Sequence, residues 1–331
     1  MKKTNICIIG GDGIGPDIMT QAKKVLMKLG PDFEYSKAYA GYDEYKRNGS
    51  PLSDKTIKLV RDADAILFGA VTTPPHIEGY FSPIVKLRKK LDLYANIRPI
   101  KSIPLSPMRQ DIDIVIFREN TEDLYAGIER QIPDGAVTER IITRANSERI
   151  IEKAFHFATE NKRKKVTLIH KSNVMRLTDG LFLKIGCEIA KKYKEIEFED
   201  MLVDSCAMRL VLAPEKFDVL VTTNMFGDIL SDEAAGLVGG LGVVASANIG
   251  DKTALFEPVH GSAPKYQGKD IANPSAMFFA TAMMLDYLGY VTLAHQLNKA
   301  VLKSIKSGNT TRDLGGNLKT SEFTDVVLSN L

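Results

Sequence analysis

Tryptophan is absent from this 331-residue sequence, and cysteine occurs only as Cys7, Cys187 and Cys206. Three scattered cysteines are too few for a disulfide framework or a thiolate metal site, so a reducing, cytoplasmic setting is expected. No apolar run is long enough for a transmembrane helix, and the N-terminal run lacks the features of a signal peptide. An excess of one charge is also missing. The 44 basic and 41 acidic residues leave a net charge of +3, which gives no support for a nucleic-acid or membrane partner.

The sequence does contain 44% hydrophobic residues, enough for a large core and two domains. Short apolar runs alternate with segments of helical periodicity, and this alternation predicts an α/β fold with a largely parallel sheet. The expected strands are residues 6–9, 65–68, 112–117, 165–169 and 219–222. The expected helices are residues 17–29, 82–93, 147–160, 178–193, 228–237, 274–288 and 291–306.

One segment departs from this alternation. Residues 129–144 alternate charged and apolar side chains around the turn signal Pro133-Asp134-Gly135. The pattern predicts a projecting hairpin. Because an isolated two-stranded hairpin is poorly stable, its expected use is to clasp a second subunit.

Asp228 and Asp232 directly follow the apolar strand expected at residues 219–222. If Asp228 opens a helix, the two carboxylates point the same way from one face. They would repel each other unless a divalent cation lay between them, and Mg²⁺ or Mn²⁺ prefers such oxygen ligands. The end of a parallel strand is also where α/β proteins place ligand sites. The alternative of an N-cap Asp and a solvated Asp stays open for this pair alone.

Basic residues form a second set of candidates. Arg88 and Arg98 lie ten residues apart, and Arg118 follows an expected strand. Guanidinium groups bind carboxylates bidentately, so these three favour a substrate with several carboxylates, with surface ion pairs as the alternative. Lys171 follows the strand at residues 165–169. Nearby cations would depress its pKa, so that it could act as a base near neutral pH.

Glycine-rich loops are a third feature. Residues 10–16 follow the first strand, but Asp12 interrupts the glycines and the spacing of a dinucleotide fingerprint is not met. A tight turn into a helix with Pro16 in its first turn is the simpler interpretation. Residues 255–266 are rich in small and turn residues and could wrap a flat nucleotide, although alone they indicate only a loop.

Together these segments resemble the β-decarboxylating hydroxyacid dehydrogenases, which include isocitrate, 3-isopropylmalate and homoisocitrate dehydrogenases. The matching motifs cover essentially the whole chain, and their order is far more specific than any one of them. They are GDGIGP at 11–16, LDLYANIRP at 91–99, RENTEDLY at 118–125, HKSNV at 170–174, TTNMFGDILSD at 222–232, GGLG at 239–242, SANIGD at 246–251 and FEPVHGSAP at 256–264.

The resemblance implies a homodimer of two-domain α/β subunits with a dimer arm and shared active sites. A discontinuous nucleotide-binding domain would comprise residues 1–98 and 238–331. Residues 99–237 would form the domain for substrate, metal and dimerisation, with the arm at about 129–144. The resemblance also accounts for the missing dinucleotide fingerprint, because this family holds its nucleotide with loops from the C-terminal part of the chain.

The resemblance further implies roles for individual residues. Tyr125 would protonate the product, and Lys171 of a partner subunit would assist deprotonation of the C2 hydroxyl. Asp204, also across the dimer, would join Asp228 and Asp232 around Mg²⁺ or Mn²⁺, which acts as a Lewis acid. The residues implied in substrate binding are Ser82, Arg88, Arg98, Arg118 and Asn173. The residues implied in cofactor binding are Thr72, Asn224, Glu257, His260, Gly261, Ala263, Lys265, Tyr266, Asn273 and Arg312.

Cofactor choice depends on Lys265, Tyr266 and Arg312. NAD-using members commonly carry an acidic residue where this chain has Lys265, and Lys265-Tyr266 is similar to NADP-type isocitrate dehydrogenases. Arg312 stands where a proline is frequent in NAD-type relatives. A cation favours a 2′-phosphate, so NADP is favoured over NAD. Surface cations without a ligand are the alternative.

Substrate choice depends on the start of the helix before Arg88. The Ser82-Pro83-Ile84-Val85 run and the loop before it resemble homoisocitrate dehydrogenases. Ser82 also matches isocitrate enzymes, whereas the apolar Ile84 and Val85 would suit an isopropyl group. Homoisocitrate, with isocitrate as a further substrate, is the prediction; 3-isopropylmalate or isocitrate alone is the alternative. A silent regulatory subunit is disfavoured because Tyr125, Lys171 and the three aspartates are all present.

Overall fold

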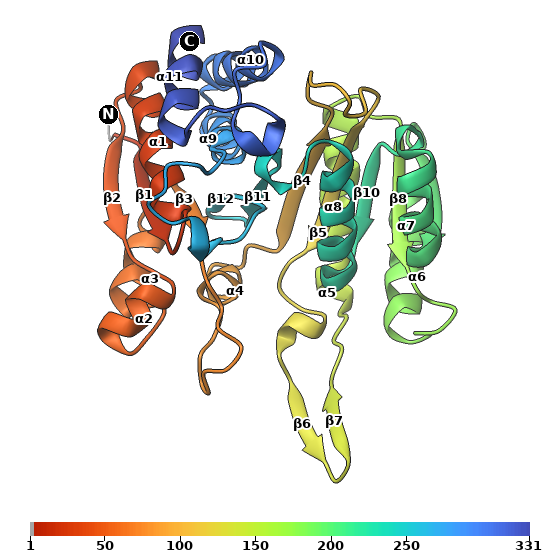
Figure 1. Ribbon diagram of the computed structural model, residues 1–331. Helices are drawn as coiled ribbons and strands as arrows, with labels where there is room; N and C mark the ends of the chain where they lie inside the picture. Colours follow the sequence, from red (N-terminus) through yellow and green to blue (C-terminus); the bar gives the residue numbers. More distant parts are fainter. Residues whose placement is uncertain (1–2) are drawn as a thin grey trace.

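The computed structural model describes residues 3–331. A single ten-stranded sheet runs through the molecule in the order β2-β1-β3-β12-β11-β4-β5-β10-β8-β9 (Figure 1). Its strands are β1 (Asn5–Gly11), β2 (Glu34–Ala38), β3 (Ala65–Ala70), β4 (Ala95–Lys101), β5 (Asp113–Glu119), β8 (Lys165–His170), β9 (Glu197–Leu202), β10 (Val219–Thr222), β11 (Ala245–Ile249) and β12 (Ala254–Pro258).

The helices lie on both faces of this sheet (Figure 1). They are α1 (Gly15–Leu29), α2 (Tyr42–Asn48), α3 (Asp54–Arg61), α4 (Pro83–Lys90), α5 (Arg144–Glu160), α6 (Thr178–Ala190), α7 (Val203–Leu212), α8 (Asn224–Leu237), α9 (Ser275–Tyr287), α10 (Val291–Lys306) and α11 (Thr320–Asn330). The predicted α/β class with a largely parallel sheet is confirmed. None of the helices in residues 3–331 is long and apolar enough to cross a membrane.

The middle of the sheet differs from its two sides. Pairs from β2 to β12 and from β5 to β9 are parallel, whereas β12–β11, β11–β4 and β4–β5 are antiparallel. The pairing of β11 with β4 is short, from Ala247 opposite Ile97 to Ile249 opposite Ala95. This short antiparallel joint connects the two parallel halves.

The predicted domain division falls at this joint. The boundary at residue 98 lies inside β4, which pairs with β11 on one side and β5 on the other. One hydrophobic cluster is confined to residues 94–221, but another draws residues from both proposed domains. The division into residues 1–98 plus 238–331 and residues 99–237 is therefore a proposal. The two proposed domains would share strand β4 and would not be joined there by a flexible linker.

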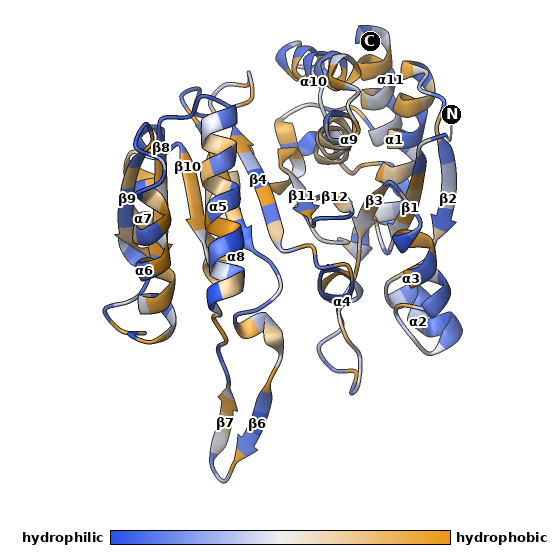
Figure 2. Cartoon of the chain, turned by 180° about the vertical axis from the view of Figure 1, so that it is seen from behind, coloured by the Kyte–Doolittle hydropathy of each residue, from blue (hydrophilic) through white to orange (hydrophobic). Residues whose placement is uncertain are grey.

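Hydrophobic residues concentrate on the inner strands, as the orange segments of β8 and β10 show (Figure 2). Cys7 is fully buried in this core, as predicted, and burial raises the pKa of its thiol to about 11. Cys206 is buried as well, whereas Cys187 is exposed.

The predicted hairpin is confirmed for residues 129–138, but it ends earlier than the predicted residue 144, because Arg144 already begins α5. β6 (Glu129–Ile132) pairs antiparallel with β7 (Gly135–Thr138) around the Pro133-Asp134 turn. It projects away from the sheet (Figure 1), and nearly all of its residues are exposed. We refer to residues 129–138 as the arm. No second chain is present, so its predicted contact with another subunit stays a prediction.

Candidate active site

The acidic pair lies on α8, but α8 does not begin where the sequence predicted. It begins at Asn224, one turn before Asp228, so the prediction that Asp228 opens the helix is wrong. Asn224 is buried and its side chain binds Arg118 at 2.9 Å and the Glu122 carbonyl at 3.1 Å, which ties the first turn of the helix to the sheet. Asp228 and Asp232 still share one face, because both reach Arg98. The N-cap alternative for Asp228 is thereby excluded.

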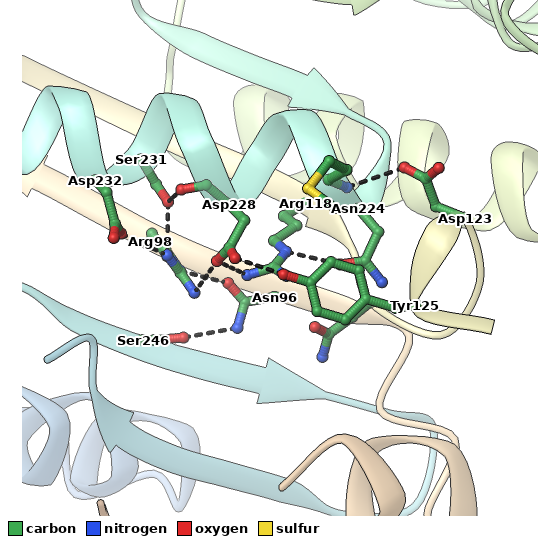
Figure 3. A network of polar contacts seen from close by, with 12 residues as sticks. Asn96, Arg98, Arg118, Asp123, Tyr125, Asn224, Asp228, Ser231, Asp232 and Ser246 are labelled. Carbon is green, nitrogen blue, oxygen red and sulfur yellow. Dashed lines mark hydrogen bonds and ion pairs between the residues drawn. The ribbon is translucent and has the colours of Figure 1, made fainter. Parts of the chain in front are cut away.

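Two buried arginines surround Asp228 (Figure 3). Arg98 on β4 contacts Asp228 at 3.4 Å and Asp232 at 3.3 Å. Arg118 on β5 forms a closer ion pair with Asp228. The two arginines are almost wholly buried, whereas the Asp228 and Asp232 side chains are 37% and 51% exposed. Positive charge is therefore held rigidly behind two carboxylates that solvent and ligands can reach.

The two carboxylates differ in proton affinity. Burial alone would raise the pKa of Asp228, but the charge of Arg118 and the bond from Tyr125 hold it below its usual range. Burial raises the pKa of Asp232, opposed by Arg98 and reinforced by the neighbouring Asp228. A divalent cation between them would stabilise the ionised form of both, and the donor set of hard oxygens suits Mg²⁺ or Mn²⁺.

Tyr125 points its hydroxyl at the same carboxylate. The residue lies in the short 3₁₀ helix η1 (Leu124–Ala126), and its Oη is 2.5 Å from Asp228 Oδ2. Burial raises the pKa of Tyr125, an effect that Arg118 opposes and the bond to Asp228 reinforces. The phenol therefore stays protonated at neutral pH and can act as a proton donor.

Gly227 allows Arg118 to pass beneath α8. A Cβ atom at this position would lie 2.6 Å from Arg118 Cγ and 2.7 Å from its Cβ, closer than real Cβ contacts allow. The close packing of the Arg118 side chain against α8 therefore requires a glycine at position 227. Any larger residue would displace the arginine that holds Asp228.

Arg88 does not bond Asp228, although its charge is among the causes that lower the pKa of that carboxyl. It extends from α4 to Glu257 on β12 at 2.8 Å, and both side chains are buried. Glu257, predicted to bind the cofactor, is therefore held by Arg88 in this structure. Asn248 joins the two groups, since its amide donates to Glu257 at 2.8 Å and its oxygen accepts from Asn96 at 2.7 Å. Ser82 directly precedes α4 and is half-buried.

Most of the predicted nucleotide residues lie on three loops beside β3 and β12. Asn224 and Glu257 do not, because Asn224 begins α8 and Glu257 lies within β12. Thr72 bonds Ser262 through their hydroxyls at 2.7 Å, which joins the loop after β3 to the HGSAP loop. His260 has a buried Nε2 atom without a protein partner, a free polar position that suits a ligand. Asn273 donates to Asp313 at 2.9 Å, which brings the segment after η4 (Pro264–Tyr266) close to η5 (Arg312–Leu314).

The side chains proposed to choose the cofactor are exposed. Lys265 Nζ lies 4.9 Å from the centre of the Tyr266 ring, and neither side chain is buried. Arg312 is exposed at the start of η5, while Gly261 is exposed and Ala263 has a left-handed backbone. These cations are free to meet a phosphate.

Lys171 and Asp204 form a separate pair. They contact each other directly, from the loop after β8 and the start of α7, and Asn173 on the same loop is exposed. Within residues 3–331 no three His, Cys, Asp or Glu side chains converge as a metal site. The charged neighbour of Lys171 is thus a carboxylate, not the predicted arginines. A role for Lys171 and Asp204 in the site of a second subunit stays a prediction.

Sequence reasoning missed the polar residues that support the arginines. Asn96 is fully buried and binds Arg98 at 2.8 Å and Ser246 at 2.8 Å. A signal was present, because Asn96 and Arg98 alternate on one face of an otherwise apolar strand, as do Ser246 and Asn248 on β11. Polar residues at period two inside a buried strand indicate an internal site.

Asp12 was also missed. The interpretation of residues 10–16 as a tight turn fits the structure, since Gly11 and Gly13 have positive φ angles. Asp12, which interrupts the glycines, is buried and accepts backbone N–H bonds from Tyr42, Asp43 and Thr72 at 2.7, 2.9 and 2.8 Å. It holds the Thr72 loop against the turn.

Known proteins share this arrangement. A family model described as isocitrate/isopropylmalate dehydrogenase matches residues 5–327. The homoisocitrate dehydrogenase of Methanocaldococcus jannaschii is 51% identical, with 98% of this chain and 96% of that protein covered. The 3-isopropylmalate dehydrogenase of Archaeoglobus fulgidus is 50% identical, with 100% of both chains covered. The crystal structure of isocitrate dehydrogenase from Methylococcus capsulatus has a TM-score of 0.97 and 46% identity, with 99% of each chain covered.

Proposed function

The chain belongs to the isocitrate/isopropylmalate dehydrogenase family and is an oxidoreductase, and on this premise we propose its reaction and substrate. The reaction is the metal- and NAD(P)-dependent oxidative decarboxylation of a 3-substituted malate. The observation that carries this proposal is the group of Arg98, Arg118 and Tyr125 around the accessible carboxylate of Asp228.

Each residue of this group has a step to perform. Arg98 and Arg118 bind and orient the carboxylates of the substrate. Because both arginines are buried on the sheet, their side chains are already ordered in the folded protein, and substrate binding does not have to restrict them further. Tyr125 keeps its proton at neutral pH and delivers it to the carbon from which CO₂ has left. Lys171 of a second subunit takes up the proton of the C2 hydroxyl. Asp228 and Asp232, joined by Asp204 of a second subunit, would hold a divalent metal that would supply a Lewis acid, and a bound nicotinamide would supply the hydride acceptor.

Homoisocitrate is the proposed natural substrate. The Ser82 hydroxyl at the start of α4 can bond a third carboxylate, which homoisocitrate has and 3-isopropylmalate lacks. The homoisocitrate dehydrogenase at 51% identity supports the same choice. The relatives named for isopropylmalate and isocitrate stand at 50% and 46%, so similarity alone does not choose between the three acids.

The test is a steady-state panel of homoisocitrate, isocitrate and 3-isopropylmalate with Mg²⁺ and each nicotinamide cofactor. We expect the highest kcat/KM with homoisocitrate. A higher kcat/KM with 3-isopropylmalate would reject the substrate assignment and keep the reaction. No turnover of any of the acids would reject the reaction itself.

Replacing the acid and the base is expected to give separable defects. Tyr125→Phe removes the proton donor, so the decarboxylation half should slow by about a hundredfold while hydride transfer is largely kept. Lys171→Met should slow hydride transfer itself. Substrate deuterated at C2 distinguishes them: the isotope effect on kcat falls toward unity for Tyr125→Phe and rises for Lys171→Met. Equal isotope effects in both variants would contradict these roles.

The nucleotide proposal is a preference for NADP over NAD. Lys265 and Arg312 are exposed and can pair with a 2′-phosphate. At about 1 kcal/mol for each pair, the two together correspond to roughly a thirtyfold preference. Lys265→Asp with Tyr266→Ile should move kcat/KM toward NAD, because repulsion is added as attraction is lost. Lys269→Asp, another exposed lysine nearby, is the control. A clear NAD preference in the unmodified enzyme would overturn the proposal.

A further inference from the structure

Arg140 lies at the root of the arm, two residues after β7, and only 12% of its side chain is exposed. Its guanidinium group contacts Met175 and Thr178 through Nη1, and each of its three nitrogens also has a closer partner. Nε donates to Asp123 at 2.6 Å, Nη1 pairs with Asp179, and Nη2 donates to Thr223 Oγ1 at 2.9 Å. Both aspartates are fully buried. A buried cation thus joins segments that are far apart in the sequence.

The first partner leads to Tyr125. Asp123 accepts the backbone N–H of Leu124 at 2.9 Å, at the start of η1, and that of Met225 at 2.9 Å, in the first turn of α8. Figure 3 shows the second of these bonds, from the Met225 N–H next to Asn224 to the Asp123 carboxylate. Asp123 also has a positive φ of 69°, a conformation that a non-glycine residue keeps only when its surroundings enforce it. Arg140 and these bonds enforce it, and so they set the direction of η1.

The second partner leads to Lys171. Asp179 at the start of α6 accepts the backbone N–H of Lys171 at 2.5 Å. The third partner, Thr223, directly precedes α8, which carries Asp228. One guanidinium group therefore contacts the supports of the proton donor, of the base and of the acidic pair.

We propose that Arg140 is a positioning residue that couples the two active sites of a dimer. This inference rests on the proposed function, in which Tyr125 serves the site of its own subunit and Lys171 serves that of the other. A displacement at Arg140 then changes Tyr125 in one site and Lys171 in the other at the same time. The arm is joined to this point, because the Asp123 N–H donates to the Ile141 carbonyl at 2.9 Å.

The geometry requires arginine. A lysine ammonium can neutralise one carboxylate, but it cannot hold Asp123, Asp179 and Thr223 with a planar fork of fixed directions. Arg140→Lys therefore keeps the buried charge and the fold, but the side chain no longer fixes the positions of Asp123, Asp179 and Thr223 relative to one another. The change expected is a fall in kcat, with KM for the cofactor unchanged.

Arg163 is a matched control. It is 17% exposed and pairs with Asp113 at 2.7 Å and Asp218 at 2.9 Å. These groups lie at the opposite ends of β5, β8 and β10, away from Arg118 and Lys171. Arg163→Lys thus perturbs an arginine that also binds two carboxylates, although these are 52% and 20% exposed, without touching the site. In the homodimer we expect Arg140→Lys to lower kcat by about tenfold to a hundredfold and Arg163→Lys to leave it unchanged.

Hybrid dimers test the coupling itself. Two differently tagged subunits are co-expressed, one with Tyr125→Phe and the other with Lys171→Met, and the hybrid is purified through both tags. If the sites are shared, one site combines the intact Tyr125 and the intact Lys171, and about half of the wild-type activity returns. Arg140→Lys is then added to either subunit in turn.

The proposal expects both placements to lower the remaining activity. With Arg140→Lys in the subunit that supplies Lys171, the deuterium isotope effect at C2 should rise; in the subunit that supplies Tyr125, it should fall. An effect in one placement only, or the same effect from Arg163→Lys, would overturn the coupling and leave the proposed function intact. An inactive hybrid beside an active wild type would instead reject the shared site, and the coupling with it. Absence of turnover in the wild type would reject the proposed function.

Discussion

Asp228→Asn is expected to lower kcat by about a thousandfold while the protein stays folded. The change removes the carboxylate that contacts Arg98, Arg118 and Tyr125, and with it a hard anionic oxygen for the proposed metal. Lewis-acid stabilisation is worth several kcal/mol, and about 4 kcal/mol corresponds to a thousandfold in rate. The measurements are kcat at saturating Mg²⁺ and Mn²⁺, metal affinity by calorimetry and circular dichroism of the variant.

Glu233→Gln is the control for this prediction. Glu233 also lies on α8, next to Asp232, and is half-buried, but within residues 3–331 it forms no hydrogen bond or ion pair with the two arginines, so its loss should leave kcat within about twofold. Wild-type turnover of the Asp228 variant, or undiminished turnover of the wild type in excess EDTA, would remove the metal from the proposal.

Val211→Lys with Leu212→Lys is expected to give monomers with at most about a hundredth of the wild-type activity. Six exposed apolar residues lie on α7, on α8, which contacts α7, and on the loop before α6, and we expect them to form one patch: Val174, Leu177, Met208, Val211, Leu212 and Ile229. Such a patch is typical of a protein interface. In a symmetric dimer each substitution occurs twice, so four side chains at about 1.5 kcal/mol each lose about 6 kcal/mol of association energy. Monomers would lack the Lys171 of a second subunit.

Met27→Lys is the matched control, because Met27 is also an exposed apolar residue and lies on α1, outside the patch. It should leave both the mass by light scattering and the turnover unchanged. A Val211/Leu212 variant that stays dimeric would place the interface elsewhere. A variant that becomes monomeric and keeps full activity would show that one chain holds a complete site.

Local sequence signals predicted most of the framework. The helix at Val291–Lys306 and the strand at Val219–Thr222 have the predicted bounds, because apolar periodicity and turn residues are local properties. The error at α8 has a local cause as well. The polar Asn224 and the glycine at 227 gave the first turn no apolar helical pattern. That turn is held instead by bonds from Asn224 to Glu122 and Arg118, which lie in other segments.

By itself, the sequence determined the α/β class, the projecting arm, the core position of Cys7 and the residue types of the site. Each depends on spacing along the chain or on motif order. Only the tertiary structure decided that Arg98 and Arg118 converge on Asp228, that Arg88 reaches Glu257 instead, and that Lys171 pairs with Asp204 away from that cluster. These contacts join residues more than 30 positions apart. Their geometry follows from strand order in the sheet, which no local pattern encodes.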